Sequence, residues 1–225
     1  MTYVIDAGDR PALPTTDGAL FPVRRIWCVG RNYAEHAREM GHSGREAPFF
    51  FSKPWGAATV AAEVPYPPGT EDLHHEVELV VALGAGGSTV SPADLPNLIW
   101  GATVGVDLTR RDVQGEAKKK GRPWDMAKGF DHSAPMAPLR PIARCGPIDR
   151  GRIRLSVNGA PRQDADLSEM IWSVAEHVAE LSKLVALAPG DMVMTGTPAG
   201  VAAVSRGDVV ECSVEGIAEH RFALV

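Results

Sequence analysis

The stretch HHEVELVVALG, residues 74–84, decides how this chain folds. It begins with alternating polar and apolar residues and continues as an apolar run that ends at a glycine, which is typical of a buried strand. Because side chains alternate across a strand, Glu76 and Glu78 point to the same side, with Cα atoms roughly 6.6 Å apart. Two carboxylates in a hydrophobic strand cannot both ionise cheaply without a cation. The stretch therefore predicts part of a metal site, although an edge strand whose glutamates face water would give the same pattern.

A second apolar run, residues 98–108, supplies a third carboxylate where it ends, at Asp107. A helix is expected directly afterwards, from Thr109 as its N-cap through Lys120. Together with the two glutamates, Asp107 would offer only oxygen ligands, which suit Mg²⁺, Mn²⁺ or Ca²⁺ better than zinc. The alternative is that Asp107 is an ordinary acid at a helix N-terminus.

The remaining sequence predicts many strands and few helices. Residues 1–22 are rich in Pro, Gly, Asp and Thr, and we expect them to form a strand-poor arm in front of a single domain, residues 23–225. The elements do not alternate as in a βαβ fold, so an α+β, mainly β fold is predicted. Further strands are expected at 23–30, 48–52, 153–157, 192–195, 209–214 and 217–224, and further helices at 32–41 and 167–187.

Composition excludes several classes of protein. The chain has 225 residues, of which 44% are hydrophobic and 23% charged, as in an ordinary globular protein. Its formal net charge of −5 gives no electrostatic reason to expect nucleic acid or an anionic membrane as a partner. No apolar run has the length of a bilayer span, and the first ten residues do not resemble a signal peptide. The three scattered cysteines are typical of a reducing cytoplasm, where we expect the protein to act.

A histidine and a glutamate share one face of the first predicted helix. His36 and Glu39 are three residues apart, which places their side chains side by side. A neighbouring carboxylate raises the pKa of an imidazole and orients it, as a general base that activates water requires. An exposed pair of no functional consequence is the alternative.

Several other charged residues stand in positions that suit an anionic substrate. Lys128 is a polar residue among small and apolar ones, and it could neutralise an enolate or a carboxylate. Arg110 and Arg111 open a predicted helix against its dipole, which favours a role in holding a substrate carboxylate. Residues 195–200 could bind an anion through free N–H groups, or form a tight structural turn. Lys118–Lys120 are interpreted as a solvated helix end.

Six motifs follow one another along the chain. They are GRNYAEHAREM (30–40), FFSKP (50–54), HEVEL (75–79), DLTRRDVQ (107–114), WDMAKGFD (124–131) and PGDMVMTGTPAGV (189–201). In this order they make the chain similar to the fumarylacetoacetate hydrolase family, in its short, single-domain bacterial branch. Within that family the lead-in FPVRR (21–25) and the pair Arg110-Arg111 resemble the fumarylpyruvate hydrolases of gentisate-type aromatic catabolism.

The resemblance implies a mixed β-sandwich roll, usually a homodimer, with one Mg²⁺ or Mn²⁺ ion and a small 2-oxo acid as substrate. It further implies a role for each residue that matches a family motif. The implied metal ligands are Glu76, Glu78 and Asp107; the implied catalytic residues are His36, Glu39 and Lys128; and the implied substrate contacts are Arg31, Arg110, Arg111, Gln114 and Thr197.

The implied reaction is hydrolysis of a carbon–carbon bond in an acylpyruvate, giving fumarate and pyruvate from fumarylpyruvate. Relatives that decarboxylate oxaloacetate, or that isomerise and decarboxylate acids of the homoprotocatechuate pathway, would use the same metal ligands. These activities therefore remain alternatives. A non-catalytic, metal-stabilised binding protein is an alternative from a different class.

Overall fold

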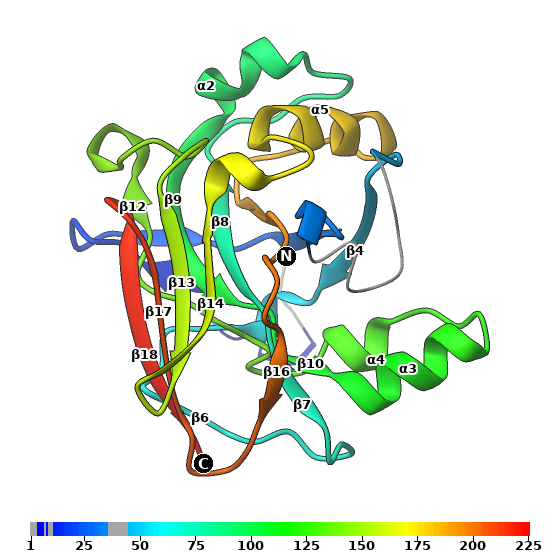
Figure 1. Ribbon diagram of the computed structural model, residues 1–225. Helices are drawn as coiled ribbons and strands as arrows, with labels where there is room; N and C mark the ends of the chain where they lie inside the picture. The colour runs from blue at the N-terminus through cyan, green and yellow to red at the C-terminus, as the bar shows by residue number, and fades with distance from the viewer. Residues whose placement is uncertain (1–3, 7, 9–10, 36–44) are drawn as a thin grey trace.

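The computed structural model describes residues 4–6, 8, 11–35 and 45–225. Its largest sheet has six strands, and residues 77–83 of the HHEVELVVALG stretch form one of its inner strands (Figure 1). The sheet is mixed, because β15 pairs with one neighbour in parallel and with the other antiparallel. In spatial order the strands are β12 (Arg140–Pro141), β9 (Ile99–Val106), β8 (Val77–Leu83), β15 (Asp191–Met194), β3 (Arg25–Gly30) and β4 (Phe49–Lys53).

A five-stranded sheet packs against β8 and β9 of the first sheet, so the two sheets enclose a hydrophobic core (Figure 1). Two of its strands form a hairpin at Asn158-Gly159, where both residues have positive φ angles of 52° and 77°. The order is β14 (Ala160–Asp166), β13 (Arg152–Val157), β17 (Val209–Val214), β18 (Ala218–Leu224) and β6 (Glu63–Val64).

Strand β8 lies between two hydrophobic clusters, which explains why its sequence is apolar throughout residues 79–83. All seven of its residues are buried. Leu79, Val81 and Leu83 belong to the cluster between the two sheets, whereas Val80 and Ala82 belong to a second cluster on the opposite face. A strand that buries both faces cannot alternate apolar with polar residues.

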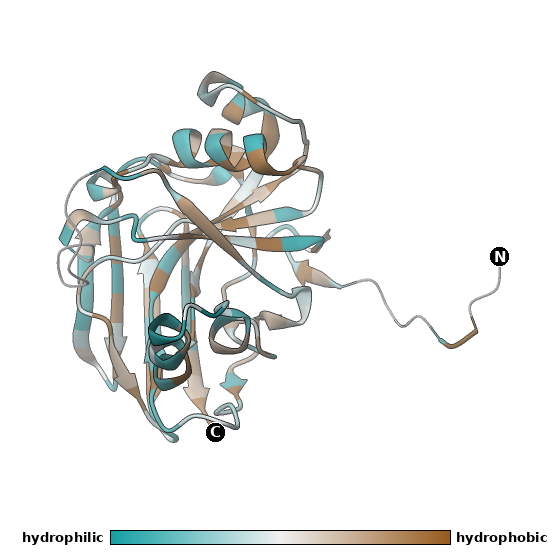
Figure 2. Ribbon diagram, turned by 90° about the vertical axis from the view of Figure 1, so that its right-hand side faces the viewer, coloured by the Kyte–Doolittle hydropathy of each residue, from teal (hydrophilic) through white to brown (hydrophobic). Residues whose placement is uncertain are grey.

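Shorter elements complete the fold. Three small sheets pair β10 (Thr109–Arg110), β7 (Leu73–His75) and β16 (Ala202–Val204); β11 (Ala134–Pro135) and β5 (Ala58–Thr59); and β1 (Ala12–Pro14) and β2 (Leu20–Pro22). The α-helices are α2 (Leu95–Leu98), α3 (Arg111–Lys119), α4 (Asp125–Lys128) and α5 (Val174–Leu184), and Figure 2 shows hydrophilic residues on their exposed turns. Single 3₁₀ turns lie at Trp55–Ala57, Pro92–Asp94, Ile142–Arg144 and Leu167–Glu169. None of the helices described is long and apolar enough to cross a membrane.

Three expectations about individual elements were wrong. Residues 12–22 form a hairpin whose Leu13 and Phe21 are buried, so this part of the expected arm belongs to the packed body. Thr109 does not cap a helix, because it pairs with β7, and α3 begins two residues later. The helix expected over residues 167–187 is shorter, because Ser173 and Glu176 form a capping box that starts α5 only at Val174.

Candidate active site

Three carboxylates meet where β8 and β9 approach the edge of the large sheet. Glu76 occupies the one-residue gap between β7 and β8, Glu78 is in β8, and Asp107 directly follows β9. The backbone N–H of Asp107 donates to the carbonyl of Glu76 at 2.7 Å, which ties the two strand ends together. One carboxylate oxygen from each residue lies within 4.8 Å of the others. All three residues are buried, so the interpretation of glutamates on a strand edge facing water is wrong.

Two buried lysines neutralise part of this acidic cluster. The Lys128 ammonium donates to Glu76 Oε2 at 2.8 Å and to Asp107 Oδ2 at 2.7 Å. Lys53, at the end of β4, lies 2.7 Å from Asp107 Oδ1 and donates to the Ser133 hydroxyl at 3.0 Å. A role for Lys53 was not predicted from the sequence. The place of Lys53 at the end of an apolar strand, within the motif FFSKP (50–54), could have indicated one.

Glu76 is the best-paired acid of the cluster. Burial raises the pKa of its carboxyl, but Lys128 and the hydrogen-bonded guanidinium of Arg111 outweigh burial and hold that pKa well below its usual range. Burial lowers the pKa of the Lys128 ammonium, whereas the nearby Asp107 and Glu76 carboxylates raise it, with a net upward shift. Glu76 and Lys128 are therefore both charged at neutral pH.

Glu78 is in the opposite situation. Burial raises the pKa of its carboxyl well above the usual value, and the neighbouring Asp107 and Glu76 raise it further. Its described hydrogen bond offsets little of this cost of ionisation, since the donor is the neutral backbone N–H of Gly196 at 2.7 Å. A third buried carboxylate that has no directly paired cation among the described residues fits a divalent metal ion, which would supply the missing positive charge. The donor set thus fits Mg²⁺ or Mn²⁺.

The loop that follows β15 contains residues 195–200, for which the sequence allowed either an anion-binding site or a tight structural turn. Its Gly196 N–H does bind an anion, but that anion is the Glu78 carboxylate. Gly196 has a φ of 89°, and a Cβ there would lie 2.7 Å from the Asn32 Cβ. The side-chain amide of Asn32 donates to the carbonyls of Thr195 and Trp172 and holds the loop in place.

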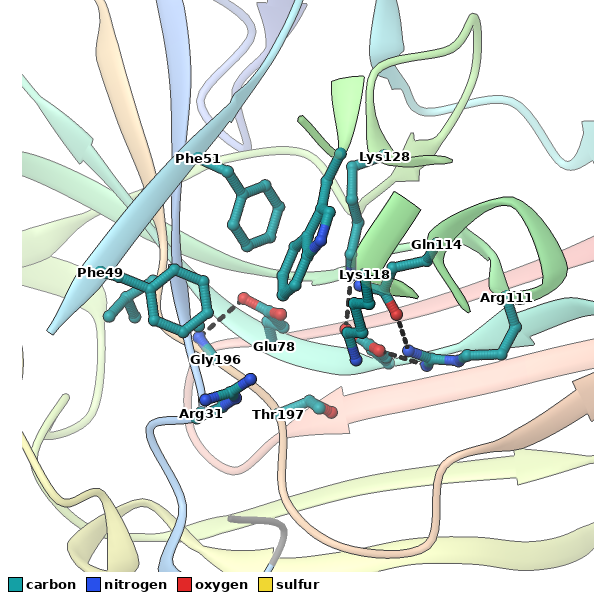
Figure 3. Close-up of a pocket in the computed structure, with 14 residues that line it drawn as sticks. Arg31, Phe49, Phe51, Glu78, Arg111, Gln114, Lys118, Lys128, Gly196 and Thr197 are labelled. Carbon is teal, nitrogen blue, oxygen red and sulfur yellow. Dashed lines mark hydrogen bonds and ion pairs between the residues drawn. The ribbon is translucent and has the colours of Figure 1, made fainter. Parts of the chain in front are cut away.

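Beside the acidic cluster lies a small cavity, which Glu76 and Glu78 help to line. Figure 3 shows aromatic and cationic side chains around it. The rings of Phe49 and Trp124 meet edge to face, 5.5 Å between centroids, and the Arg31 guanidinium lies 5.3 Å from the Phe49 ring. Lys118 also lines the cavity, half-buried against Trp124, so its interpretation as part of a solvated helix end was wrong.

The two neighbouring arginines have different surroundings. Arg111 lines the cavity, where it donates to Glu76 and, at 2.6 Å, to the side-chain oxygen of Gln114. Arg110 does not line it: its guanidinium lies over the Phe130 ring at 4.4 Å and donates to the carbonyl of Met126.

The structure therefore brings together most of the predicted site. The residues that line the cavity or the acidic cluster are Arg31, Glu76, Glu78, Asp107, Arg111, Gln114, Lys128 and Thr197. His36 and Glu39 lie outside the described residues, so their proposed cooperation stays a prediction.

Comparison with known proteins gives a consistent family. Residues 25–225 match the family described as "Fumarylacetoacetate (FAA) hydrolase C-terminal". A structure of fumarylpyruvate hydrolase from Pseudomonas aeruginosa, in complex with Mn²⁺ and pyruvate, is 45% identical with a TM-score of 0.95, covering 100% of this chain and 99% of that one.

Two curated relatives are similar at nearly equal identity. Fumarylpyruvate hydrolase of a Ralstonia species is 41% identical over 182 residues, 81% of this chain and 94% of the relative. The mitochondrial oxaloacetate tautomerase FAHD1 of Rattus norvegicus is 40% identical over 209 residues, 89% of this chain and 95% of the relative.

These matches cover nearly the whole described domain, and they confirm the predicted α+β, mainly β fold of this family. They also support an enzyme over the non-catalytic binding protein considered as an alternative. The chain belongs to the fumarylacetoacetate hydrolase family.

Proposed function

We propose that this protein is a metal-dependent acylpyruvate hydrolase that cleaves fumarylpyruvate to fumarate and pyruvate with Mg²⁺ or Mn²⁺. The observation that carries the proposal is the buried trio Glu76, Glu78 and Asp107 beside a cavity whose other charged side chains are all cationic among the described residues. A relative whose structure contains Mn²⁺ and pyruvate, at 45% identity, supports the same metal class and the same product.

Charge favours a substrate that is anionic at both ends. Among the described residues, five cationic side chains surround the three carboxylates even before a divalent metal is added: Arg31, Lys53, Arg111, Lys118 and Lys128. Arg111 lies beside Glu76, whereas Arg31 lies on the other side of the cavity, next to Phe49 (Figure 3). We propose that the cluster side of the cavity takes the 2-oxo acid end, and that Arg31 and Lys118 hold the far carboxylate. The Phe49 and Trp124 rings suit the flat, conjugated chain between these ends.

When bound by the three carboxylates, the metal ion would act as a Lewis acid toward the oxygens of a 2-oxo acid. Hydrolysis forms a bond between a water oxygen and the distal carbonyl carbon, and it breaks the bond from that carbon to the methylene group. The electron pair leaves with the pyruvate part as an enolate, which then takes up a proton. Lys128 is buried and cationic next to Glu76 and Asp107, so its ammonium can stabilise the developing enolate charge without reorganisation.

His36, oriented by Glu39, is the proposed base that takes the proton from water. Replacing His36 by Ala is therefore expected to lower hydrolysis by a factor of about 100 to 10,000 and to leave Mn²⁺ affinity unchanged, since general-base catalysis contributes roughly that much. Single-turnover hydrolysis and Mn²⁺ titration measure the two quantities. Hydrolysis by His36→Ala at the parent rate would contradict the assignment.

Oxaloacetate tautomerisation is the second candidate, and it rests on the 40% identity with the rat tautomerase. Oxaloacetate is also a 2-oxo dianion that passes through an enol form, so the acidic trio and Lys128 would serve both reactions. Decarboxylation of oxaloacetate, and isomerisation or decarboxylation of homoprotocatechuate-pathway acids, place the same demand on these residues.

The deciding experiment follows the ultraviolet absorbance of fumarylpyruvate with purified protein and Mg²⁺ or Mn²⁺, and repeats the assay with EDTA. Metal-dependent decay with equal amounts of fumarate and pyruvate supports the hydrolase. If fumarylpyruvate is stable while enol-oxaloacetate is rapidly converted to its keto form, the tautomerase is the better description. We also propose a homodimer, which sedimentation equilibrium tests directly.

A further inference from the structure

One buried glutamine connects the strand that carries the metal ligands to the loop that lines the cavity. Gln163, in β14, is only 1% exposed. Its side-chain oxygen accepts from the backbone N–H of Val77 at 3.0 Å. Its side-chain nitrogen donates to the carbonyl of Pro198 at 2.9 Å and to the hydroxyl oxygen of Thr197 at 2.8 Å.

The two backbone partners fix which way this amide points. A backbone N–H can only donate and a carbonyl can only accept. If the amide oxygen and nitrogen of Gln163 were exchanged, a donor would face the Val77 N–H and an acceptor would face the Pro198 carbonyl. The nitrogen therefore faces Thr197, and the Thr197 hydroxyl is the acceptor in that hydrogen bond.

A hydroxyl that accepts in this bond keeps its own hydrogen for another partner. No acceptor for that hydrogen is present among the side chains and backbone groups described, although Thr197 is only 3% exposed. Thr197 lines the cavity and follows Gly196, whose N–H binds Glu78. The hydrogen is therefore free to bond to a ligand in the cavity beside the metal-binding cluster.

We propose that Gln163 is a positioning residue that makes the Thr197 hydroxyl a fixed hydrogen-bond donor to the carboxylate of the bound 2-oxo acid. The proposal rests on the proposed function for the identity of the ligand. Without Gln163, the Thr197 hydroxyl could turn its hydrogen toward the protein and present a lone pair, which repels an anion.

Two further features hold this connection rigid. The loop lies against β14 because residue 200 is glycine: a Cβ at Gly200 would lie 2.1 Å from the carbonyl oxygen of Arg162. On the other side, Nδ1 of the buried His75 lies 3.0 Å from the Gln163 oxygen. That oxygen can only accept, so His75 donates from Nδ1. Gln163 thus holds groups on both sides of Glu76 as well as the loop.

Variants with opposite hydrogen-bonding properties test the proposal. In Gln163→Glu a carboxylate would accept from Thr197 and turn the hydroxyl hydrogen away from the cavity, while an oxygen still accepts from Val77 N–H. In Gln163→Leu the hydroxyl has no side-chain partner at position 163 and can still rotate toward the ligand. Thr197→Val removes the hydroxyl, and Thr197→Ser retains it.

The primary measurement is pyruvate affinity of the Mn²⁺-loaded protein by calorimetry, with Mn²⁺ affinity measured separately. We expect Thr197→Val and Gln163→Glu each to weaken pyruvate binding about 10- to 100-fold, as for loss of a hydrogen bond to a charged group. The Thr197→Val/Gln163→Glu double variant should bind pyruvate no more weakly than the weaker of its two single variants. Gln163→Leu should lose less than Gln163→Glu, and Thr197→Ser should bind like the parent.

A purely structural role predicts similar losses in the two variants, because Leu removes every hydrogen bond at position 163 and Glu places an oxygen against the Pro198 carbonyl. Equal losses in the two variants, greater loss in Gln163→Leu, or multiplicative losses in the double variant would overturn the proposal. If Gln163→Glu does not fold, the comparison of Gln163→Leu, Thr197→Val and their double variant still decides: multiplicative losses exclude a shared path. Because pyruvate binding needs no turnover, failure to hydrolyse fumarylpyruvate would count against the proposed function alone.

Discussion

At the scale of single residues, the two glutamates of the candidate metal site should affect stability with opposite sign. Glu78 has its pKa raised by burial and by Asp107, so its ionised form destabilises the metal-free protein above the usual carboxyl pKa. We expect Glu78→Gln to raise the unfolding free energy of the metal-free protein at pH 7 by at least about 1 kcal/mol, since one pKa unit corresponds to about 1.4 kcal/mol. Thermal unfolding in the presence of EDTA measures this change in stability. Added Mn²⁺ should stabilise the parent protein but not the Glu78→Gln variant.

Glu76→Gln is the matched comparison. Burial opposes ionisation of Glu76, but Lys128 and Arg111 hold its pKa low, so its charge stabilises the fold above the usual pKa and that stability is lost as the pH falls. Removing the charge takes away the acidic partner of Arg111 and one of the two carboxylate partners of Lys128, which should cost about 3 kcal/mol or more. Equal effects of the two variants in EDTA would contradict this account of the site.

Lys118 offers a residue-scale test of the far end of the cavity. Burial, together with Arg111 and Arg31, lowers the pKa of Lys118 to about 8. Lys118→Gln should lower kcat/KM for fumarylpyruvate about 10- to 100-fold, the effect of losing one charged hydrogen bond. In the parent, kcat/KM should fall as the pH rises through about 8, because deprotonation removes the positive charge, and the variant should lack this fall.

Lys119→Gln is the control for Lys118, because the neighbouring lysine is exposed on the same helix and does not line the cavity. It removes the same charge from the protein as a whole. A similar loss in both variants would point to general electrostatic attraction in place of a specific contact.

At the scale of elements, the loop after β15 depends on a close approach to β14. Gly200 and Gly207 both have positive φ, 93° and 88°, but a Cβ at Gly200 would meet the Arg162 carbonyl at 2.1 Å, whereas Gly207 has open space around it. Gly207→Ala should cost only about 1–2 kcal/mol for the left-handed backbone conformation. Gly200→Ala should cost more and also weaken pyruvate binding, because it displaces the Thr197 loop. Urea unfolding and calorimetry measure both effects; equal stability and affinity in the two variants would refute this dependence.

At the scale of the whole molecule, β8 belongs to both hydrophobic clusters and should make them unfold together. Trp27 packs against the cluster between the sheets, and Trp100 packs against the second cluster. Two variants test this: Trp27→Phe, which retains Trp100, and Trp100→Phe, which retains Trp27. The other three tryptophans are unchanged in both variants. The two variants should show the same urea midpoint by fluorescence. Two separate midpoints would mean that the clusters are independent folding units.

The sequence predicted this architecture unevenly, for physical reasons. The core strands could be found because continuous apolar runs such as residues 79–83 are local signals, and the acidic trio could be found because its members precede or end such runs. Element boundaries failed where a tertiary partner competed with a local preference. Thr109 can cap a helix, but its backbone pairs with β7.

The parts of the site that could not be predicted depend on contacts between distant segments. Lys118 has ordinary helix neighbours in sequence, and only the packing of α3 against Trp124 turns it toward the cavity. Gln163 lies on a strand with mostly exposed residues, and its partners are 34 and 86 positions away in the chain. No local periodicity carries such information.

The placement of the acidic strand between two cores has a consequence for how substrate range evolves. Inserting or deleting one residue in β8 would exchange its two faces, disturbing both cores and the carboxylates at once. Two other cations that line the cavity come from different places, Arg31 directly after β3 and Lys118 from α3. Mutational drift can therefore explore new acyl groups through these peripheral segments while the inherited chemistry stays unchanged, so specificity and reaction type can diverge at different speeds among descendants of one ancestor.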